Sequence, residues 1–169
     1  MNIHDYLIEQ EGKDWSSFMA DWDFLLPSSF TMWMVNRFGD MILLLDDGSV
    51  HFFDVGVGTV ERVADNREHF CDLVDLDDNA NHWLMIKLTD ACVAAGLTLG
   101  PSQCYSFKNP PILGGAYSVE NVWPADLAVH YSFQADICKQ AKDLPDGTKV
   151  KIVIGKPQPC STSLSPQKP

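Results

Sequence analysis

The sequence lacks the patterns that mark secreted and membrane-spanning proteins. It has no run of about 18 apolar residues, and its first residues contain neither the basic nor the apolar segment of a secretion signal. The five cysteines form no CxxC pair and show no repeated spacing, which is typical of free thiols in a reducing compartment. We therefore expect a cytoplasmic protein without structural disulfides.

Motifs for phosphate, metal and covalent chemistry are absent as well. The chain contains no GxSxG, GxxxxGK[ST], HExxH or GxGxxG. The segment from Asp75 imitates the start of a calcium loop, but Ala80 stands where that loop needs glycine and Ile86 where it needs glutamate. His69 and Cys71 are two positions apart, so they do not share a helix face. We expect no cofactor, no metal and no enzymatic activity.

Acidic residues are plentiful but unevenly placed. Residues 1–78 hold 17 acidic and 4 basic side chains, whereas residues 79–169 hold 6 acidic and 8 basic ones, and together they give the net charge of −11. A negative surface repels nucleic acid and anionic membranes and speeds the encounter with a basic protein. Solubility alone is the simpler explanation of the charge, and both stay open at this point.

Length and composition indicate one folded domain. The 169 residues can bury a sizeable core, and a hydrophobic content of 46% with 11% aromatic residues excludes disorder for most of the chain. The segment 155–169 is rich in proline and serine, which is typical of disorder. We predict a single domain over residues 1–154 and a disordered tail after it.

Apolar spacing predicts two helices and then a hairpin in the first part of the chain. Residues 3–25 fit an amphipathic helix, and residues 28–38 fit a second helix that Gly39 stops. The apolar runs 41–45 and 50–54 flank the turn sequence Asp46-Asp47-Gly48-Ser49, which predicts a β-hairpin, and a third strand is expected over 58–63.

The second part of the chain alternates between helical and extended patterns. We predict a helix capped by Asp65, a helix over 79–95 that Gly96 stops, strands at 104–107 and 117–123, a helix over 125–141 and a last strand at 148–154. This order predicts an α+β fold with a mainly antiparallel sheet and helices packed on it. It does not fit a doubly wound nucleotide-binding fold.

The stretch GPSQCYSFKNPPILGGAYSVENV, residues 100–122, resembles the C-terminal domain of type VI secretion immunity proteins that pair with DNase toxins. A looser similarity extends over residues 20–154. This group is similar to the SUKH-type α+β immunity folds, and its longer relatives carry an N-terminal GAD-like domain that we expect to be absent or reduced here. The positions that match the motif are Cys104, Tyr105, Phe107, Lys108, Pro111, Leu113, Gly114, Gly115, Tyr117, Glu120 and Asn121.

The resemblance implies a protein that binds and neutralises a toxin, with a DNase as the expected partner, and it implies no catalytic residue. The acidic first half supplies a mechanism, because a nuclease keeps a basic cleft for phosphate that carboxylates can occupy. From charge placement we predict that the toxin contacts eight side chains: Asp46, Asp47, Asp54, Glu61, Asp72, Asp75, Asp77 and Asp78.

Two other functions stay open. One is a small hydrolase that uses Cys104 and His130 with an aspartate brought close by the fold, and a lowered pKa of the Cys104 thiol would favour it. The other is a regulatory or adaptor module unrelated to toxins.

The proline and glycine pairs within residues 104–117 also allow two interpretations. As a scaffold, the stretch is a stiff corner with Phe107 and Tyr117 packed inward. As a ligand loop, it would use the polar side chains of Lys108 and Glu120.

Overall fold

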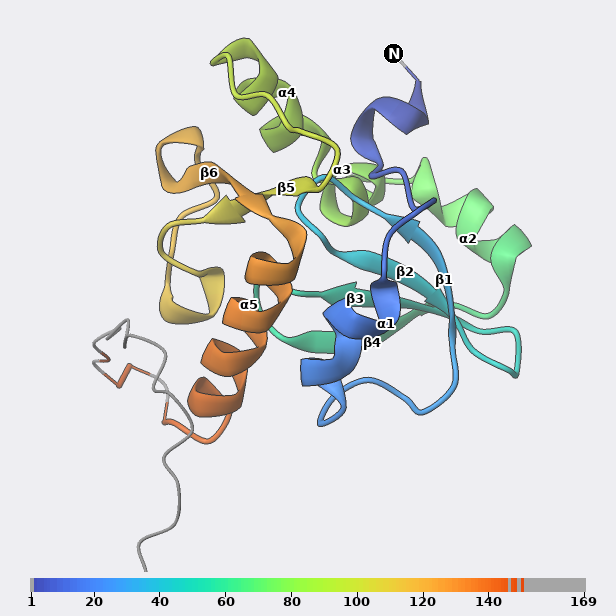
Figure 1. Ribbon diagram of the computed structural model, residues 1–169. Coiled ribbons are helices and arrows are strands. Elements are labelled where there is room, and N and C mark those ends of the chain that lie inside the picture. Colours follow the sequence, from blue (N-terminus) through green and yellow to red (C-terminus); the bar gives the residue numbers. More distant parts are fainter. Residues whose placement is uncertain (1, 146, 149, 151–169) are drawn as a thin grey trace, which may run out of the picture.

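A four-stranded antiparallel sheet forms the middle of the molecule (Figure 1). The computed structural model describes residues 2–145, 147, 148 and 150. The strands are β1 (Thr31–Val35), β2 (Met41–Leu44), β3 (Val50–Asp54) and β4 (Thr59–Ala64), and each pairs with the next along the chain. The predicted hairpin and third strand are therefore confirmed, as is the α+β class.

Strand β2 is buried on both faces, because alternate side chains enter two separate cores. Met41 and Leu43 belong to one apolar cluster, whereas Ile42 and Leu44 belong to another on the opposite side of the sheet. Period-two alternation of side chains across a strand produces this division. The sheet is thus the middle layer of three.

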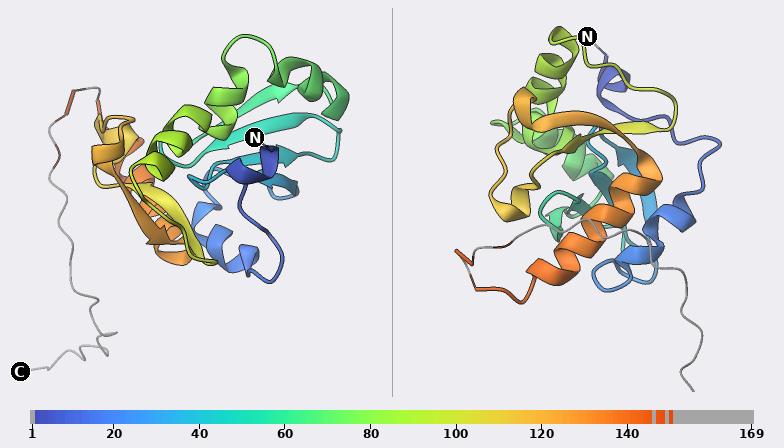
Figure 2. Two further views of the ribbon diagram at one scale, coloured as in Figure 1. Left: turned by 90° about the horizontal axis from the view of Figure 1, so that it is seen from above. Right: turned by 60° about the vertical axis from the view of Figure 1, so that its left-hand side comes forward.

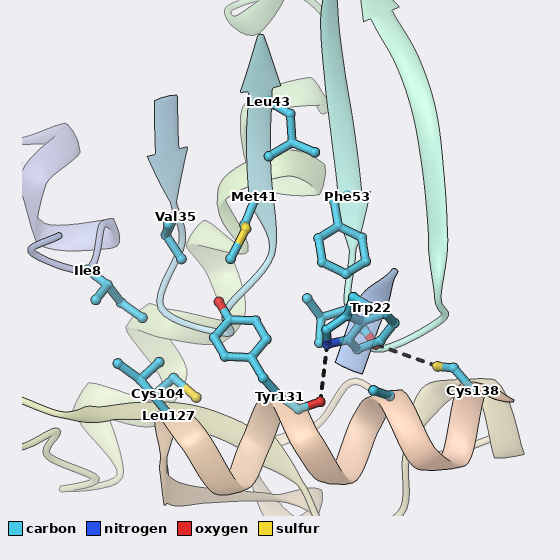
Figure 3. Close-up of a cluster of buried hydrophobic side chains, with 12 residues drawn as sticks. Ile8, Trp22, Val35, Met41, Leu43, Phe53, Cys104, Leu127, Tyr131 and Cys138 are labelled. Atoms are coloured by element: carbon cyan, nitrogen blue, oxygen red, sulfur yellow. Dashed lines mark hydrogen bonds between the residues drawn. The ribbon is translucent and has the colours of Figure 1, made fainter. Parts of the chain in front are cut away.

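Helices α1 (Trp15–Met19) and α5 (Leu127–Ala141), with the 3-10 helix η2 (Ala20–Trp22), cover the first face. Trp22 lies at the centre of this core with 0% of its surface exposed, and its indole Nε1 donates to the carbonyl oxygen of Tyr131 at 3.1 Å (Figure 3). Phe53 meets the Trp22 ring edge-on at 4.9 Å. Through these two contacts, Trp22 connects α5 to the sheet.

Helices α2 (Arg67–Val74) and α3 (Asn79–Leu84) cover the second face. Seen from above, the green helices and the blue N-terminal helical segments lie on opposite sides of the strands (Figure 2). Phe70 of α2 stacks on Trp83 of α3 with ring centroids 4.8 Å apart, and Trp33 meets Phe70 at 5.4 Å. Aromatic pairs of this kind add to the energy of apolar burial.

A two-stranded sheet, β5 (Gln103–Phe107) and β6 (Val122–Asp126), lies beside the main sheet and leads into α5 (Figure 1). The Tyr105 N–H donates to the carbonyl oxygen of Arg37 at 2.8 Å, which joins the two sheets. Helix α4 (Ile86–Ala94) packs nearby through Cys92. The remaining described elements are the 3-10 helices η1 (Ile3–Tyr6), η3 (Pro111–Leu113) and η4 (Val119–Asn121).

The predicted helix over 28–38 is wrong, because residues 31–35 form strand β1. Met32 packs on the first core, whereas Trp33 and Met34 pack on the second. Both faces of β1 are therefore apolar, and the polar alternation that would reveal a strand is missing. Gly39 occupies the β1–β2 turn with φ at 87° and is not a helix stop.

Other predicted helices were right in place but wrong in detail. The helix expected over 3–25 is reduced to η1, α1 and η2, and the helix expected over 79–95 is split at Met85, whose φ is 54°. Asn66, not Asp65, caps α2 by accepting from the His69 N–H. Gly96 does follow the end of α4, as predicted, and α5 confirms the helix expected over 125–141.

In the C-terminal part, β5 confirms the strand predicted at 104–107, but the strand predicted at 117–123 begins only at Val122, after η4. Most of the strand predicted at 148–154, and the whole of the tail at 155–169, lie outside the described residues.

Candidate functional site

A cavity of about 570 Å³ opens between one end of the main sheet, helices α3 and α4, and the segment between β5 and β6. Titratable and aromatic side chains line its walls. They include the carboxylates Asp40, Asp54 and Asp78, the imidazoles His82 and His130, and the rings Phe38, Phe52, Phe107 and Tyr117.

Asp40 sits at the buried end of this cavity, with only 7% of its surface exposed. Asn36 builds the turn around it: its Oδ1 accepts from the N–H groups of Phe38 and Asp40, and its Nδ2 donates to Asp40 Oδ2 at 2.9 Å. The other carboxylate oxygen accepts from the Val55 N–H at 2.9 Å. Burial and repulsion from Asp54 raise the pKa of Asp40 to about 7 in spite of these bonds.

Asp54, the last residue of β3, is half-buried beside Asp40. Its Oδ1 accepts from the Val57 N–H at 2.9 Å, and burial raises its pKa in spite of this bond. The Gly56 main chain lowers the pKa of both carboxyl groups, so the two acids converge on one short segment, residues 55–57. Two carboxylates that share such a place resist ionising together.

His130, on α5, is a buried neutral imidazole. Its Nδ1 lies 3.0 Å from Ser106 Oγ, and burial lowers the pKa of the ring to about 4, although the Phe38 main chain opposes this effect. With 3% exposure, its Nε2 makes no hydrogen bond of good geometry among the described residues. An unsatisfied buried nitrogen on a cavity wall calls for an explanation.

The geometry disfavours the hydrolase interpretation. Cys104 is fully buried in the first core, and burial together with nearby Asp40 and Asp126 raises the pKa of its thiol well above the ordinary value. A protonated buried thiol is a poor nucleophile. The hydroxyl of Ser106 is also buried, and neither Cys104 nor Ser106 is among the described residues that line the cavity.

The eight carboxylates predicted from charge lie in distinct parts of the fold. Asp46 and Asp47 precede β3 and accept hydrogen bonds from Ser29 and Ser49, whereas Asp54 is at the opposite end of that strand. Glu61 is exposed on β4. The remaining four lie on α2 or in the turn after it: Asp72, Asp75, Asp77 and Asp78. The fold thus brings Asp54 and Asp78 together at one cavity and leaves the hairpin pair apart.

The motif over 104–121 folds into a closed corner. Asn121 closes it, because its Nδ2 donates to the carbonyl oxygens of Asn109 and Ala116 and its Oδ1 accepts from the Asn109 N–H. Lys108 Nζ donates to the carbonyl oxygen of Glu120 at 2.7 Å, so this side chain is used within the corner. At Gly115 a Cβ would lie 1.8 Å from the Asn109 carbonyl oxygen, so any side chain would collide with the backbone.

Four further motif residues have structural roles. The Tyr105 hydroxyl donates to the Leu97 carbonyl oxygen at 2.8 Å, Pro111 begins η3, and Gly114 follows η3 with φ at 83°. Phe107 is buried as expected, with its ring stacked 5.3 Å from that of Phe38.

Tyr117 differs from the expectation, because it is about half exposed rather than packed inward. It meets Phe107 edge-on at 5.2 Å and lines the cavity. Burial, Asp54 and Asp40 together raise the pKa of its hydroxyl, which places this group near both carboxylates. The closed corner therefore brings one aromatic wall to the acidic cavity.

Comparison with known proteins gives a family match over part of the chain. Residues 64–138 match the family described as "T6SS immunity protein Tdi1, C-terminal". The match spans α2 to α5, less than half of the chain, and supports a type VI secretion immunity protein that neutralises a toxin. The search of curated proteins gives no match.

Among solved structures, the chain is similar to the crystal structure of Atu4351 from Agrobacterium tumefaciens, with 19% identity and a TM-score of 0.43. The likeness covers 71% of this chain and 61% of that one, so the two share part of their length only. A similarity this distant carries no argument about function.

Sequence reasoning missed Asp40 and the cavity role of Tyr117. Asp40 follows a glycine in an ordinary turn sequence, and only strand pairing places it beside Val55.

Among the described residues, no group of three acidic, histidine or cysteine side chains could hold a metal ion, and no helix is long and apolar enough to cross a membrane.

Proposed function

We propose that this protein neutralises a basic nuclease toxin by binding it, without chemistry, through the acidic surface of α2 and the turn that follows it. The observation that carries the proposal is the family match over residues 64–138, which begins at this surface. The protein would act in the cytoplasm, where a nuclease toxin reaches nucleic acid. A SUKH-like relationship belongs to the same proposal.

The turn after α2, residues 75–78, has the composition of a contact site. Asp72, Asp75 and Asp77 are exposed, and no ion pair within the described part of the chain engages them. Between them stands Leu76, with 52% of its surface exposed. An apolar side chain ringed by carboxylates suits a basic partner, because burial of the leucine supplies affinity and the charges supply steering.

The backbone presents this turn rigidly. Asp77 has a positive φ of 50°, the Leu76 N–H donates to the Leu73 carbonyl oxygen at 3.0 Å, and Asn79 Nδ2 donates to the same oxygen at 2.9 Å. A preorganised turn loses little conformational entropy on binding, which favours tight association.

A charge-matched pair of variants tests the surface. Asp75→Asn/Asp77→Asn removes two charges from the turn, and Asp46→Asn/Asp47→Asn removes two from the distant hairpin; asparagine tolerates the left-handed backbone at 77. The partner in the assay is the product of the adjacent gene, tested first for nuclease activity, and its association is measured by surface plasmon resonance across a salt series. We expect the turn variant to associate roughly tenfold more slowly, with a shallower salt dependence, and the hairpin variant to resemble the wild type.

Equal effects of the two variants would refute the assignment to the turn. Affinity that does not weaken from low to physiological salt would refute the electrostatic mechanism. Failure of the chain to bind the nuclease at all would refute the function.

A further inference from the structure

We propose that the cavity beside the acidic turn receives an arginine side chain from the toxin, with its guanidinium held between Asp40 and Asp54. The proposal rests on the proposed function, because it names the toxin as the source of the arginine. It adds a specific binding pocket to the acidic surface of α2 and the following turn, which otherwise attracts the toxin by its net negative charge.

The first observation is a pair of acids without a cation. Asp40 and Asp54 converge on residues 55–57, and no described lysine or arginine pairs with either. Lys87 lines the same cavity, but its Nζ already binds Asp78 Oδ1 at 2.8 Å, at the exposed rim. Acids buried together without a counter-ion cost stability, and a bound cation would offset that cost.

The second observation is independent of the acids. His130 Nε2 lies in the cavity wall, almost fully buried, without a hydrogen bond of good geometry. The neighbouring Nδ1 lies 3.0 Å from Ser106 Oγ, and the Phe38 main chain acts on the ring only in a geometry that leaves Nε2 without a hydrogen bond. As an acceptor, a neutral imidazole nitrogen can take a third N–H from a guanidinium that two carboxylates already hold.

The shape of the walls selects guanidinium over other cations. Phe52, Phe107 and Tyr117 offer aromatic surface against which a planar cation stacks, and the forked N–H groups of arginine fit paired carboxylates. A metal ion is disfavoured because the described residues offer no three-ligand group. The volume of about 570 Å³ exceeds a single side chain, so the tip of a loop would enter with the arginine.

The arginine should bind more tightly as pH rises, because a cation is attracted to the two carboxyl groups in their ionised form. Both pKa values are raised, that of Asp40 to about 7, so the pair gains charge between slightly acidic and slightly alkaline pH. The titratable and charged groups around the pair are His82 and Lys87 from the α3–α4 side, Asp78 at the rim, Tyr117 from the corner, Cys104 from β5, Glu61 from β4, and His130, Tyr131 and Cys138 from α5.

The test uses the full chain and two small probes. N-acetyl-arginine methylamide is titrated to tens of millimolar at pH 8 and followed by the NMR shifts of the amides of residues 55–57; the citrulline analogue, of nearly the same shape but neutral, is the matched control. We expect saturable shifts with the arginine probe, at least about tenfold weaker binding of citrulline, and at least about threefold weaker arginine binding at pH 6.

Variants locate the site. Asp54→Asn keeps an acceptor for the Val57 N–H and removes the charge, and Tyr117→Ala removes a half-exposed wall with little risk to folding. We expect each to weaken arginine binding at least about fivefold, whereas Asp47→Asn on the hairpin leaves it unchanged.

Absence of saturable binding, equal binding of the two probes, or full binding by a folded Asp54→Asn chain would each overturn the proposal. If the chain captures the nuclease but binds no arginine probe, the cavity proposal fails and the proposed function stands. If the probe binds but the nuclease is not captured, the toxin is not the source of the arginine, and the proposal fails in that part together with the proposed function.

Discussion

As pH rises, the Asp40→Asn variant should gain stability relative to the wild type. The raised pKa of about 7, against an ordinary value of 3.8, means that the folded state binds the proton more tightly than the unfolded state. The contribution of Asp40 is therefore most favourable below the unfolded pKa and is lost as pH rises towards 7. The asparagine of Asp40→Asn does not titrate, so the variant keeps the same contribution at every pH in this range.

The magnitude follows from the shift. Each pKa unit corresponds to about 1.4 kcal/mol. Between pH 5.5 and pH 8, the free energy of unfolding of the wild type should therefore fall by about 2 kcal/mol relative to that of Asp40→Asn. Any constant cost of the substitution, such as a weakened bond to Asn36, cancels in this difference. The comparison thus isolates the titration of Asp40 together with its coupling to Asp54.

Urea unfolding followed by tryptophan fluorescence measures the free energies at each pH. Asp47→Asn, an exposed aspartate with a lowered pKa, is the control and should show no such relative gain towards high pH. His130 titrates in the opposite direction: its pKa is lowered to about 4, so stability is lost as pH falls below about 6.5 in wild type and variant alike. A relative shift smaller than about 0.5 kcal/mol would refute the assignment of a strongly raised pKa to Asp40.

Three further predictions concern the framework. Trp22→Ala should lower the free energy of unfolding by about 3–5 kcal/mol in urea, because the ring is fully buried, whereas Trp123→Ala, with 44% of the residue exposed, should cost far less; similar losses would contradict the central place of Trp22. Gly115→Ala should lower the melting temperature measured by circular dichroism, since its Cβ meets the Asn109 carbonyl; an unchanged value would contradict the closed corner. In alkylation mapped by mass spectrometry, exposed Cys71 should react in minutes while buried Cys104 reacts only on unfolding, and fast labelling of Cys104 would revive the hydrolase interpretation.

Local signals predicted the elements whose cause is local. The hairpin between residues 45 and 50 follows from an aspartate–glycine turn between two apolar runs, and α5 follows from helical spacing after a capping aspartate, Asp126. Cysteine spacing likewise predicted free thiols, and the four cysteines of the described residues are free. Charge counts revealed that the first half is acidic, but not how its side chains are grouped on the fold.

Long-range packing decided the rest. Residues 31–35 are a strand because β2 pairs with them and two cores take their apolar side chains, although their spacing favours a helix. The helix at 79–95 breaks at Met85, where Asn81 Oδ1 accepts from the Lys87 N–H. Neither event has a signal within a short window of sequence.

The sequence by itself determined the class of the protein: an acidic α+β chain whose motif at 100–122 resembles an immunity family. Only the tertiary structure decided where its candidate site lies. Asp40, Asp54, Tyr117 and His130 come from a turn, the end of a strand, a corner and a helix, and they meet because strand pairing and core burial hold those segments together. A pKa depends on such neighbours and on distance from water, and neither quantity is written in the order of residues.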